Sequence, residues 1–269
     1  MKTLKDILFE SVNDSEWWDG HIHLFNHKEP INKPKELTHV VGFMDLEYDK
    51  SNIDPIKSYD EYIKNHYNGS TILLATGITS EEIKEIFEKH KSVIKGFGEL
   101  KCYDTYMGED VPYKCISMVR DICRLSRDNG NLPIYLHWDV NDDKDIKKIS
   151  KVLTDYPSVP IVLCHCGMTD TNKDFSCTNV ADLQKKFTNL WVDVSYIAMQ
   201  HFHNNIMQLF QYDLDRVILG SDLNNKIFSK NHTEDERSNI LSMFRDVLLK
   251  SHINNKLNIN KLFKIKDPK

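Results

Sequence analysis

His21 and His23 lie two residues apart, directly after a short apolar run, Glu16-Trp17-Trp18. Successive side chains of a β-strand point to opposite faces, so on a strand both imidazoles would project from the same face. Two neutral imidazoles held side by side can chelate a divalent transition metal, and zinc is the commonest candidate. With 12 histidines in 269 residues, such a pair also arises by chance. The pair therefore indicates a metal site only if other ligands converge on it.

Further ionisable side chains follow the same pattern, because each falls at the carboxyl end of a run that reads as a buried strand. They are Glu99, Lys101, His137, His165 and Asp222. Together with the first pair they offer four histidines, a glutamate and an aspartate. If these ends meet, the set supplies ligands for one or two divalent ions and a bound water. Zinc is our first choice, and manganese, iron and nickel accept the same ligands.

Periodicity and punctuation predict eight strand-like runs in series, with helical patterns between nearly all of them. Several runs are almost continuous in apolar residues, which is typical of parallel strands buried on both faces. The runs are Trp17 to Leu24, Thr38 to Asp45, Thr71 to Gly77, Val93 to Lys101, Leu132 to Asp139, Pro160 to Cys166, Leu190 to Ser195 and Val217 to Asp222.

The helical patterns carry their own start signals. Capping boxes at Thr79-Glu82 and Thr233-Glu236 predict two helix starts. Further helices are expected after Pro112 and from Asp143. From Phe25 to Leu37, where two prolines occur, we expect a long loop with at most one helical turn. The first crossover helix can therefore be missing.

Eight strands alternating with helices in one chain predict an α/β fold of the (β/α)8 TIM-barrel class, with a doubly wound open sheet as the second choice. We expect a single domain over residues 1-269, with an N-terminal helical extension over 1-16 and a C-terminal helix and tail over 251-269. The connections that leave the strands are long and those that return from the helices are short. This asymmetry is typical of barrels, which keep their chemistry at the carboxyl ends of the strands.

As a set, these motifs resemble the amidohydrolase superfamily, and most closely its compact branches, the amidohydrolase-2 and TatD-related metal-dependent hydrolases. The order of the motifs and their placement on strands match from Trp17 to Asp222. A short C-terminal segment also resembles the Asn-Ala-x-Arg-Leu-Phe helix of that superfamily. The motifs are Asp19-Gly20-His21-Ile22-His23, Gly98-Glu99, Tyr135-Leu136-His137, Leu163-Cys164-His165, Gly220-Ser221-Asp222 and Asn258-Ile259-Asn260-Lys261-Leu262-Phe263.

The resemblance implies roles for individual residues. Metal ligands would be His21, His23, His137 and Asp222. Asp222 would also be the base that takes a proton from metal-bound water. His165 would bind a second metal, or stay unliganded and polarise the substrate carbonyl. Glu99 occupies the place of a bridging carboxylate. Other members use a carboxylated lysine on that strand, for which Lys101 has the right parity, but that needs an extra chemical step and we favour Glu99.

Several other residues have structural interpretations. Strand alternation points Cys164 and Cys166 away from the face that His165 uses, so we expect both thiols to pack against helices. The second pair, His201-Phe202-His203, lies in a helical segment, where residues two apart diverge by about 200° and do not chelate together. Asp193 and Ser195 share strand parity, and the sequence leaves open whether they fill the barrel or contact substrate.

Composition bounds the class of partner. The length and the 40% hydrophobic content allow a full core, and the net charge of -5 argues against non-specific nucleic-acid binding. Six cysteines without a CxxC pair suggest reduced thiols in a cytoplasmic protein. The N-terminus does not read as a signal peptide, and no apolar stretch approaches the roughly 20 residues of a membrane span. We expect a small-molecule substrate and no membrane partner, and a homo-oligomer is compatible with the sequence.

Three enzymatic functions and one binding function compete. The first is hydrolysis of an amide, ester or lactone bond of a small polar molecule, since a divalent cation lowers the pKa of water from 15.7 to about 7. The second is decarboxylation or isomerisation of a small carboxylic acid on a similar site. The third is phosphodiester cleavage on DNA, as in TatD-related proteins, against which the low basicity counts. A barrel that binds metal without turnover is the non-enzymatic alternative.

Overall fold

The computed structural model describes residues 17–26, 29–30, 37–44, 54–102, 111–138, 140, 143–168, 177–222 and 234–265. The predicted N-terminal extension over 1-16 lies outside these residues, as does the predicted capping threonine at position 233. Most of the long connections that leave the strands lie outside them too. The division of the chain into a barrel and two terminal segments therefore stays a prediction.

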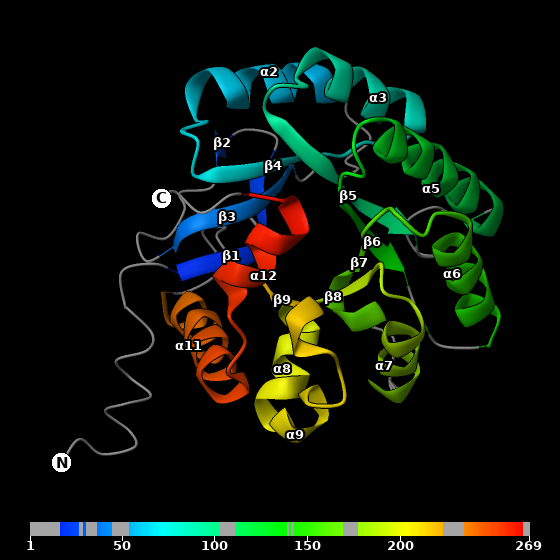
Figure 1. Cartoon of the computed structure of the whole chain (residues 1–269). Coiled ribbons are helices and arrows are strands. Elements are labelled where there is room, and N and C mark those ends of the chain that lie inside the picture. Colours follow the sequence, from blue (N-terminus) through cyan, green and yellow to red (C-terminus); the bar gives the residue numbers. More distant parts are fainter. Residues whose placement is uncertain are drawn as a thin grey trace.

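Eight parallel strands form a nearly closed barrel in sequence order, each hydrogen-bonded to the next, which confirms the predicted TIM-barrel class (Figure 1). A short strand, β2 (Glu29–Pro30), pairs antiparallel with the end of β1. Every predicted strand-like run overlaps one of the parallel strands. These are β1 (Trp17–Asn26), β3 (Leu37–Met44), β4 (Thr71–Ala75), β5 (Ile94–Cys102), β6 (Ile134–Trp138), β7 (Ile161–Leu163), β8 (Leu190–Val194) and β9 (Val217–Leu219).

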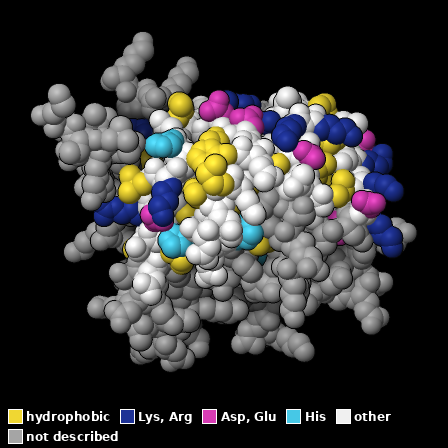
Figure 2. All heavy atoms as spheres, turned by 90° about the horizontal axis from the view of Figure 1, so that it is seen from below, with side chains coloured by type: hydrophobic (Ala, Val, Ile, Leu, Met, Phe, Trp, Pro, Cys, Tyr) yellow, Lys and Arg dark blue, Asp and Glu magenta, His cyan; other side chains and the backbone are white. Residues whose placement is uncertain are grey.

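Helices surround the strands on the outside of the barrel (Figure 1). The capping box predicted at α3 is present, because the Glu82 backbone N–H donates to Thr79 Oγ1 and the Thr79 N–H donates to Glu82 Oε2. Seen from below, the described part of the surface carries basic, acidic, histidine and hydrophobic side chains (Figure 2). The described helices are α2 (Pro55–Asn65), α3 (Ser80–Lys89), α5 (Val111–Asp128), α6 (Asp143–Asp155), α7 (Cys177–Lys186), α8 (Tyr196–Asn204), α9 (Ile206–Leu209), α11 (Glu234–Ser251) and α12 (Asn255–Phe263). Two 3-10 turns, η1 (Cys164–Gly167) and η2 (Leu214–Arg216), lie beside β7 and β9.

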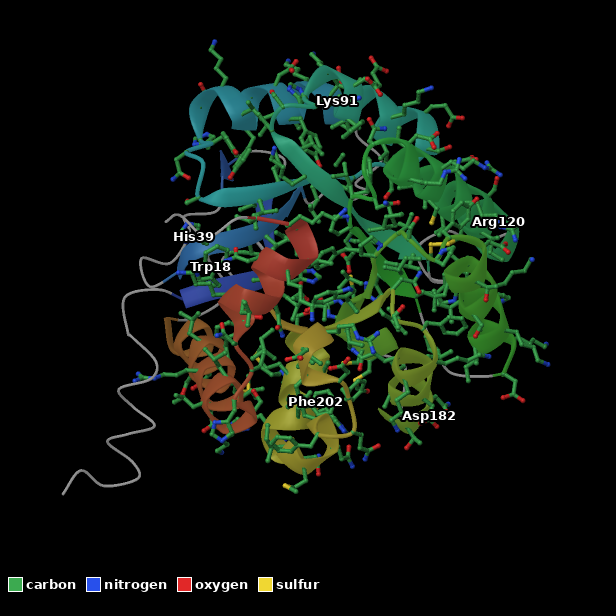
Figure 3. The ribbon with its side chains drawn as sticks, viewed as in Figure 1. Trp18, His39, Lys91, Arg120, Asp182 and Phe202 are labelled. Carbon is green, nitrogen blue, oxygen red and sulfur yellow. A yellow bond between two sulfur atoms is a disulfide. The ribbon has the colours of Figure 1, made fainter. Side chains whose placement is uncertain are left out.

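Strand alternation divides the core into two layers. On β7, Ile161 and Leu163 join the large cluster between the strands and the helices, whereas Val162 joins a smaller cluster. The smaller cluster lies inside the barrel and also contains Trp18 on β1, whose ring stacks on His39 of β3 at 4.2 Å between centroids (Figure 3). The two layers explain why the strands read as continuous apolar runs, since both faces of each strand are buried.

Helix α12 closes the barrel where its first and last strands meet. The Asn255 side-chain amide donates to Trp18 O at 2.6 Å and to Leu219 O at 2.8 Å, and its Oδ1 accepts from Leu219 N at 2.8 Å. One side chain thus joins β1 to β9. Ile259 and Leu262 of the same helix belong to the inner cluster, and the helix lies across the centre of the barrel in Figure 1.

We expect Asn255→Ala to lower the free energy of unfolding by about 3 kcal/mol. The substitution removes three buried hydrogen bonds, and each buried polar group left unpaired costs about 1–3 kcal/mol. Urea unfolding of both proteins measures the difference. Asn254→Ala on the same helix is the control, because Asn254 only caps the helix through Leu257 N, and a lost cap costs about 1 kcal/mol. Equal losses for the two variants would contradict the closing role of Asn255.

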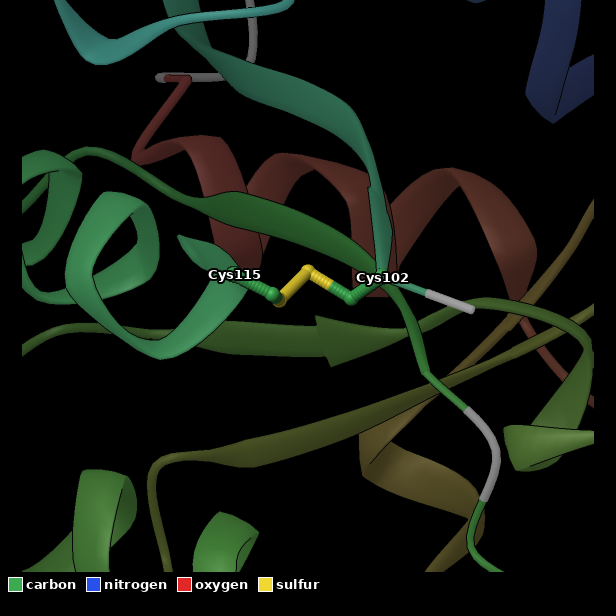
Figure 4. The surroundings of a disulfide bond; sticks show 2 residues. All are labelled: Cys102 and Cys115. Atoms are coloured by element: carbon green, nitrogen blue, oxygen red, sulfur yellow. A yellow bond between two sulfur atoms is a disulfide. The ribbon is translucent and has the colours of Figure 1, made fainter. Parts of the chain in front are cut away.

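Two of the cysteines are paired, which corrects the prediction that all are reduced thiols. Cys102 at the end of β5 and Cys115 on α5 form a disulfide with a Cα–Cα distance of 5.6 Å (Figure 4). Their spacing of 13 residues gives no recognisable sequence pattern, so only the fold brings them together. Cys123, Cys164 and Cys166 are buried and are not part of a disulfide among the described residues. Among the described residues, no helix is long and apolar enough to cross a membrane.

Candidate metal centre

His21 and His23 meet Asp222 where β1 and β9 end. His21 is fully buried, and His23 and Asp222 are each 6% exposed. The Nε2 atoms of the two imidazoles lie 3.3 Å and 3.0 Å from the same oxygen, Asp222 Oδ1. The Asp222 N–H also donates to the carbonyl of His21 at 2.8 Å, so the two strand ends are held together beside the side chains. The spacing of the histidine pair and the parallel sheet together bring these three residues to one point, as the sequence predicts.

Glu99 on β5 connects this group to the remaining predicted histidines. Its Oε2 lies 3.8 Å from His23 Nε2, and its Oε1 lies 3.4 Å from His165 Nε2 and 2.8 Å from His137 Nδ1. Glu99 is 5% exposed, whereas Lys101, two residues further along the same strand, is half-buried and pairs in register with His137. Glu99 therefore lies between the two halves of the candidate site.

The donor set fits a divalent metal. One group consists of His21, His23 and Asp222 and a second of His21, Glu99 and His165, and in each the ligand atoms lie within 4.8 Å of one another. All of these side chains are buried, and imidazole nitrogen with carboxylate oxygen is the combination that zinc and similar ions prefer. His137 lies next to the second group, with its ring centroid 4.6 Å from that of His165. The shared His21 makes the two groups adjacent parts of one centre.

Mutual attraction keeps the carboxylates of this centre ionised. Burial raises the pKa of Asp222, but His21 and His23 outweigh it and lower that pKa to about 2. Burial likewise opposes ionisation of Glu99, yet His137 and His165 hold its pKa well below the usual value. Buried carboxylates that remain charged at neutral pH are suitable for holding a cation.

The imidazoles respond in different directions. For His21, burial lowers the pKa, but the Asp193 and Asp222 carboxylates raise it to about 10. Burial is also the largest influence on His165, where Glu99 and Asp222 nevertheless raise the pKa. At His137 burial prevails and lowers the pKa, despite the neighbouring Glu99. The carboxylates of Asp193, Asp222 and Glu99 therefore surround His21, the residue that the two ligand groups share.

The turn after β7 corrects the predicted orientation of Cys164. β7 ends at Leu163, and alternation from Val162 places Cys164 in the cluster inside the barrel, whereas Cys166 packs on the helix side as predicted. A donor atom of Cys164 lies within 4.8 Å of donor atoms of His21 and Asp193.

His165 also faces the interior, because the chain leaves the extended conformation and His165 adopts a left-handed φ of 50°. A non-glycine residue in that region is strained, and such strain concentrates at functional sites.

Three buried polar residues support the ligands in ways that the sequence left undecided. The Asp19 carboxylate accepts from Ser221 N at 2.9 Å, from Ser221 Oγ at 2.5 Å and from His21 N at 3.0 Å. Burial raises the pKa of Asp19 to about 6.

Asp193 and Ser195 both face the barrel interior, and both contact the histidines. The only sign in the sequence is that Asp193 and Ser195 lie two positions apart on one predicted strand, so that both side chains point to the same face.

The second histidine pair does not converge on a common partner among the described residues. His201 Nε2 lies 2.6 Å from Gln208 Oε1, and His203 Nε2 lies 3.1 Å from Asp246 Oδ2. Both residues are on α8, and their rings engage different partners. The two rings thus face different partners, as the helical spacing predicts.

No protein-family model matches the sequence, and no curated protein has a matching sequence. Solved structures do match the fold. A candidate 2-pyrone-4,6-dicarboxylic acid hydrolase from Pseudomonas putida is 16% identical, with a TM-score of 0.59 over 93% of this chain and 98% of its own. An amidohydrolase 2 from Bifidobacterium longum subsp. infantis is 13% identical, with a TM-score of 0.57 over 93% and 99%. An amidohydrolase from Burkholderia multivorans, with bound HEPES, is 10% identical, with a TM-score of 0.60 over 93% and 99%. The chain thus has the fold of amidohydrolase structures along most of its length.

Proposed function

We propose that this protein is a metal-dependent hydrolase that acts on an amide, ester or lactone bond of a small polar substrate. The observation that carries the proposal is the meeting of two buried ligand groups, around a shared His21, at the carboxyl ends of the barrel strands. In barrel enzymes this is the end at which chemistry takes place. The fold shared with amidohydrolase structures supports the same activity.

His21, His23 and Asp222 would hold one divalent ion, and Glu99 with His165 and the adjacent His137 would hold a second. Zinc suits this ligand set best, with manganese, iron and nickel as alternatives. When bound, such an ion supplies hydroxide at neutral pH and polarises the oxygen of the scissile bond. The enclosing strands keep bulk water from the ligands. His137 is partly exposed, and the other five side chains are buried.

The side chains of the chain supply the proton transfers. Asp222, ionised because of the neighbouring imidazoles, accepts a proton from the attacking water and returns it to the leaving group. His165, whose ring centroid lies 5.2 Å from that of His21, would hold the second ion or donate a hydrogen bond to the oxygen on which negative charge develops. Asp222 and His165 are therefore the proposed catalytic residues.

A lactone is the bond type with the most specific support. A pyrone is a cyclic ester, and the matched Pseudomonas putida protein is named for hydrolysis of a pyrone dicarboxylate. Lys101 is half-buried on the strand that carries Glu99 and would offer a positive charge to an acidic substrate. We place the substrate among small molecules rather than nucleic acids because the net charge of -5 does not favour binding to a polyanion. A cytoplasmic location and the oligomeric state stay predictions, and the disulfide removes the thiol argument for the former.

We expect wild-type protein purified without added metal or chelator to contain two divalent ions per chain, and Glu99→Ala to contain one or fewer. Glu99 contacts histidines of both groups, so its removal weakens the second site most. Elemental analysis per chain measures this. One ion in both proteins would make Glu99 a supporting residue. No ion in wild type, even after reloading, would contradict the proposed function.

The reaction type is tested on the loaded protein with a panel of lactones, esters, amides and small carboxylic acids. We expect turnover of at least one lactone, ester or amide, with uptake of water into the product. Turnover confined to carboxylic acids with release of carbon dioxide would instead identify a decarboxylase. Cleavage confined to phosphodiesters would identify a nuclease-like activity.

A further inference from the structure

Asp193 and Ser195 form a buried bridge between two of the candidate ligands. Both residues are fully buried. Asp193 lies on β8, and Ser195 is the first residue after that strand. Asp193 Oδ2 lies 2.5 Å from His21 Nδ1 and accepts from Ser195 Oγ at 2.8 Å. Ser195 Oγ in turn lies 2.9 Å from His165 Nδ1. The chain of contacts therefore runs from one imidazole through a carboxylate and a hydroxyl to the other.

The direction of each hydrogen bond in this bridge follows from what each group can do. An ionised carboxylate only accepts, so the proton between His21 and Asp193 belongs to His21 Nδ1. The Ser195 hydroxyl has a single proton, which it donates to Asp193, so toward His165 its oxygen acts as acceptor. His165 Nδ1 must then carry a proton as well. Both imidazoles are consequently protonated at Nδ1.

We infer that Asp193 and Ser195 are positioning residues that keep the Nδ1 proton on His21 and on His165, so that Nε2 is the nitrogen that both rings present to the metal centre. His21 Nε2 faces Asp222 at 3.3 Å, and His165 Nε2 faces Glu99 at 3.4 Å. The two rings come from β1 and from the turn η1, which are far apart in the sequence, yet their centroids are only 5.2 Å apart. A single carboxylate thus orients one ligand in each group. The inference rests on the proposed metal site.

Backbone geometry makes β8 the suitable strand for this role. Val192 and Val194 pack toward the helices, so Trp191 and Asp193 face the barrel interior. A regular strand therefore holds Asp193 against the ligand His21. The two valines on the opposite face of the strand pack against the helices and fix its position. Partners that orient metal-binding histidines in this way raise their basicity, and losing one weakens metal binding 10- to 100-fold.

The test measures zinc affinity of the metal-free full chain by competition with a chromophoric chelator. We expect Asp193→Asn and Ser195→Ala to bind zinc 10- to 100-fold more weakly than wild type. Ser195→Thr retains the hydroxyl and should restore binding to within a few-fold. Ser126→Ala is the matched control, because Ser126 on α5 is also fully buried and its hydroxyl donates to Leu132 O, which precedes β6 and lies away from the carboxyl ends of the strands.

A nitrogen NMR measurement separates positioning from packing. In zinc-loaded wild type, His21 and His165 should show protonated Nδ1 and coordinated Nε2, and Ser195→Ala should lose this signature at His165. Unchanged zinc affinity in both folded variants, or coordination through Nδ1, would overturn the inference. If wild type binds no zinc, the proposed function fails. The Nδ1 proton of His165 in the metal-free protein then decides whether the bridge exists.

Discussion

His21→Ala is expected to reduce zinc binding more than any other single substitution in the centre, by more than about a hundredfold. His21 is the residue common to both ligand groups, so its removal takes a donor from each. Loss of a residue that only orients a ligand already costs 10- to 100-fold, and a lost ligand costs at least as much. Competition with a chelator gives the affinity, and elemental analysis after dialysis should find less than a tenth of the wild-type metal. Any turnover found with the substrate panel should fall in parallel.

His201→Ala is the matched control for this result. It removes the same kind of side chain from the same short pattern, but on α8, where the ring engages Gln208. We expect wild-type metal content and affinity for this variant. Because His21→Ala leaves the Asp193 and Asp222 carboxylates close together, its folding should be checked by circular dichroism at neutral pH. A folded His21→Ala protein that keeps its metal would show that the ion binds elsewhere.

Gly220→Ala is expected to destabilise the barrel by about 3 kcal/mol and to disturb the metal centre at the same time. A Cβ at position 220 would lie 2.4 Å from His21 Cβ, 2.8 Å from His21 N and 3.0 Å from His21 Cα. These atoms belong to the first strand of the barrel and cannot rotate away, so β1 and β9 must separate. Overpacking of a tight core costs about 1–3 kcal/mol and sometimes more. Urea unfolding measures the loss, and zinc competition should show weaker binding because His21 moves.

Gly77→Ala provides the comparison for Gly220→Ala. Its added Cβ would meet side-chain atoms only, at 3.1 Å from Ile83 Cγ1 and 3.2 Å from Glu82 Cβ. Those side chains can adjust by a few tenths of an ångström, so we expect a loss below about 1 kcal/mol and unchanged zinc affinity. Equal losses at the two glycines would show that β1 and β9 are not held as closely as the structure places them.

The sequence by itself determined the barrel and most of the candidate ligands. Continuous apolar runs alternating with amphipathic helices allow few packings, because each strand must be covered on both faces. Parallel strands also bring their carboxyl ends to the same side, so residues that end strands, such as His21, Glu99 and Asp222, were predictable as neighbours. The motif resemblance to amidohydrolases rests on those residues and is confirmed at the level of the fold.

Only the tertiary structure decided the features that depend on departures from regular geometry or on contacts distant in sequence. Alternation counted from His165 gave the wrong side for Cys164, because β7 ends at Leu163 and the left-handed turn at His165 brings Cys164 and His165 to the same side. The Cys102–Cys115 disulfide depends on where α5 packs against the end of β5. The bridge through Asp193 joins side chains 172 positions apart, and no local pattern encodes such a contact. Periodicity reports which face of an element is buried, whereas hydrogen-bond partners within the barrel are set by how the strands close around it.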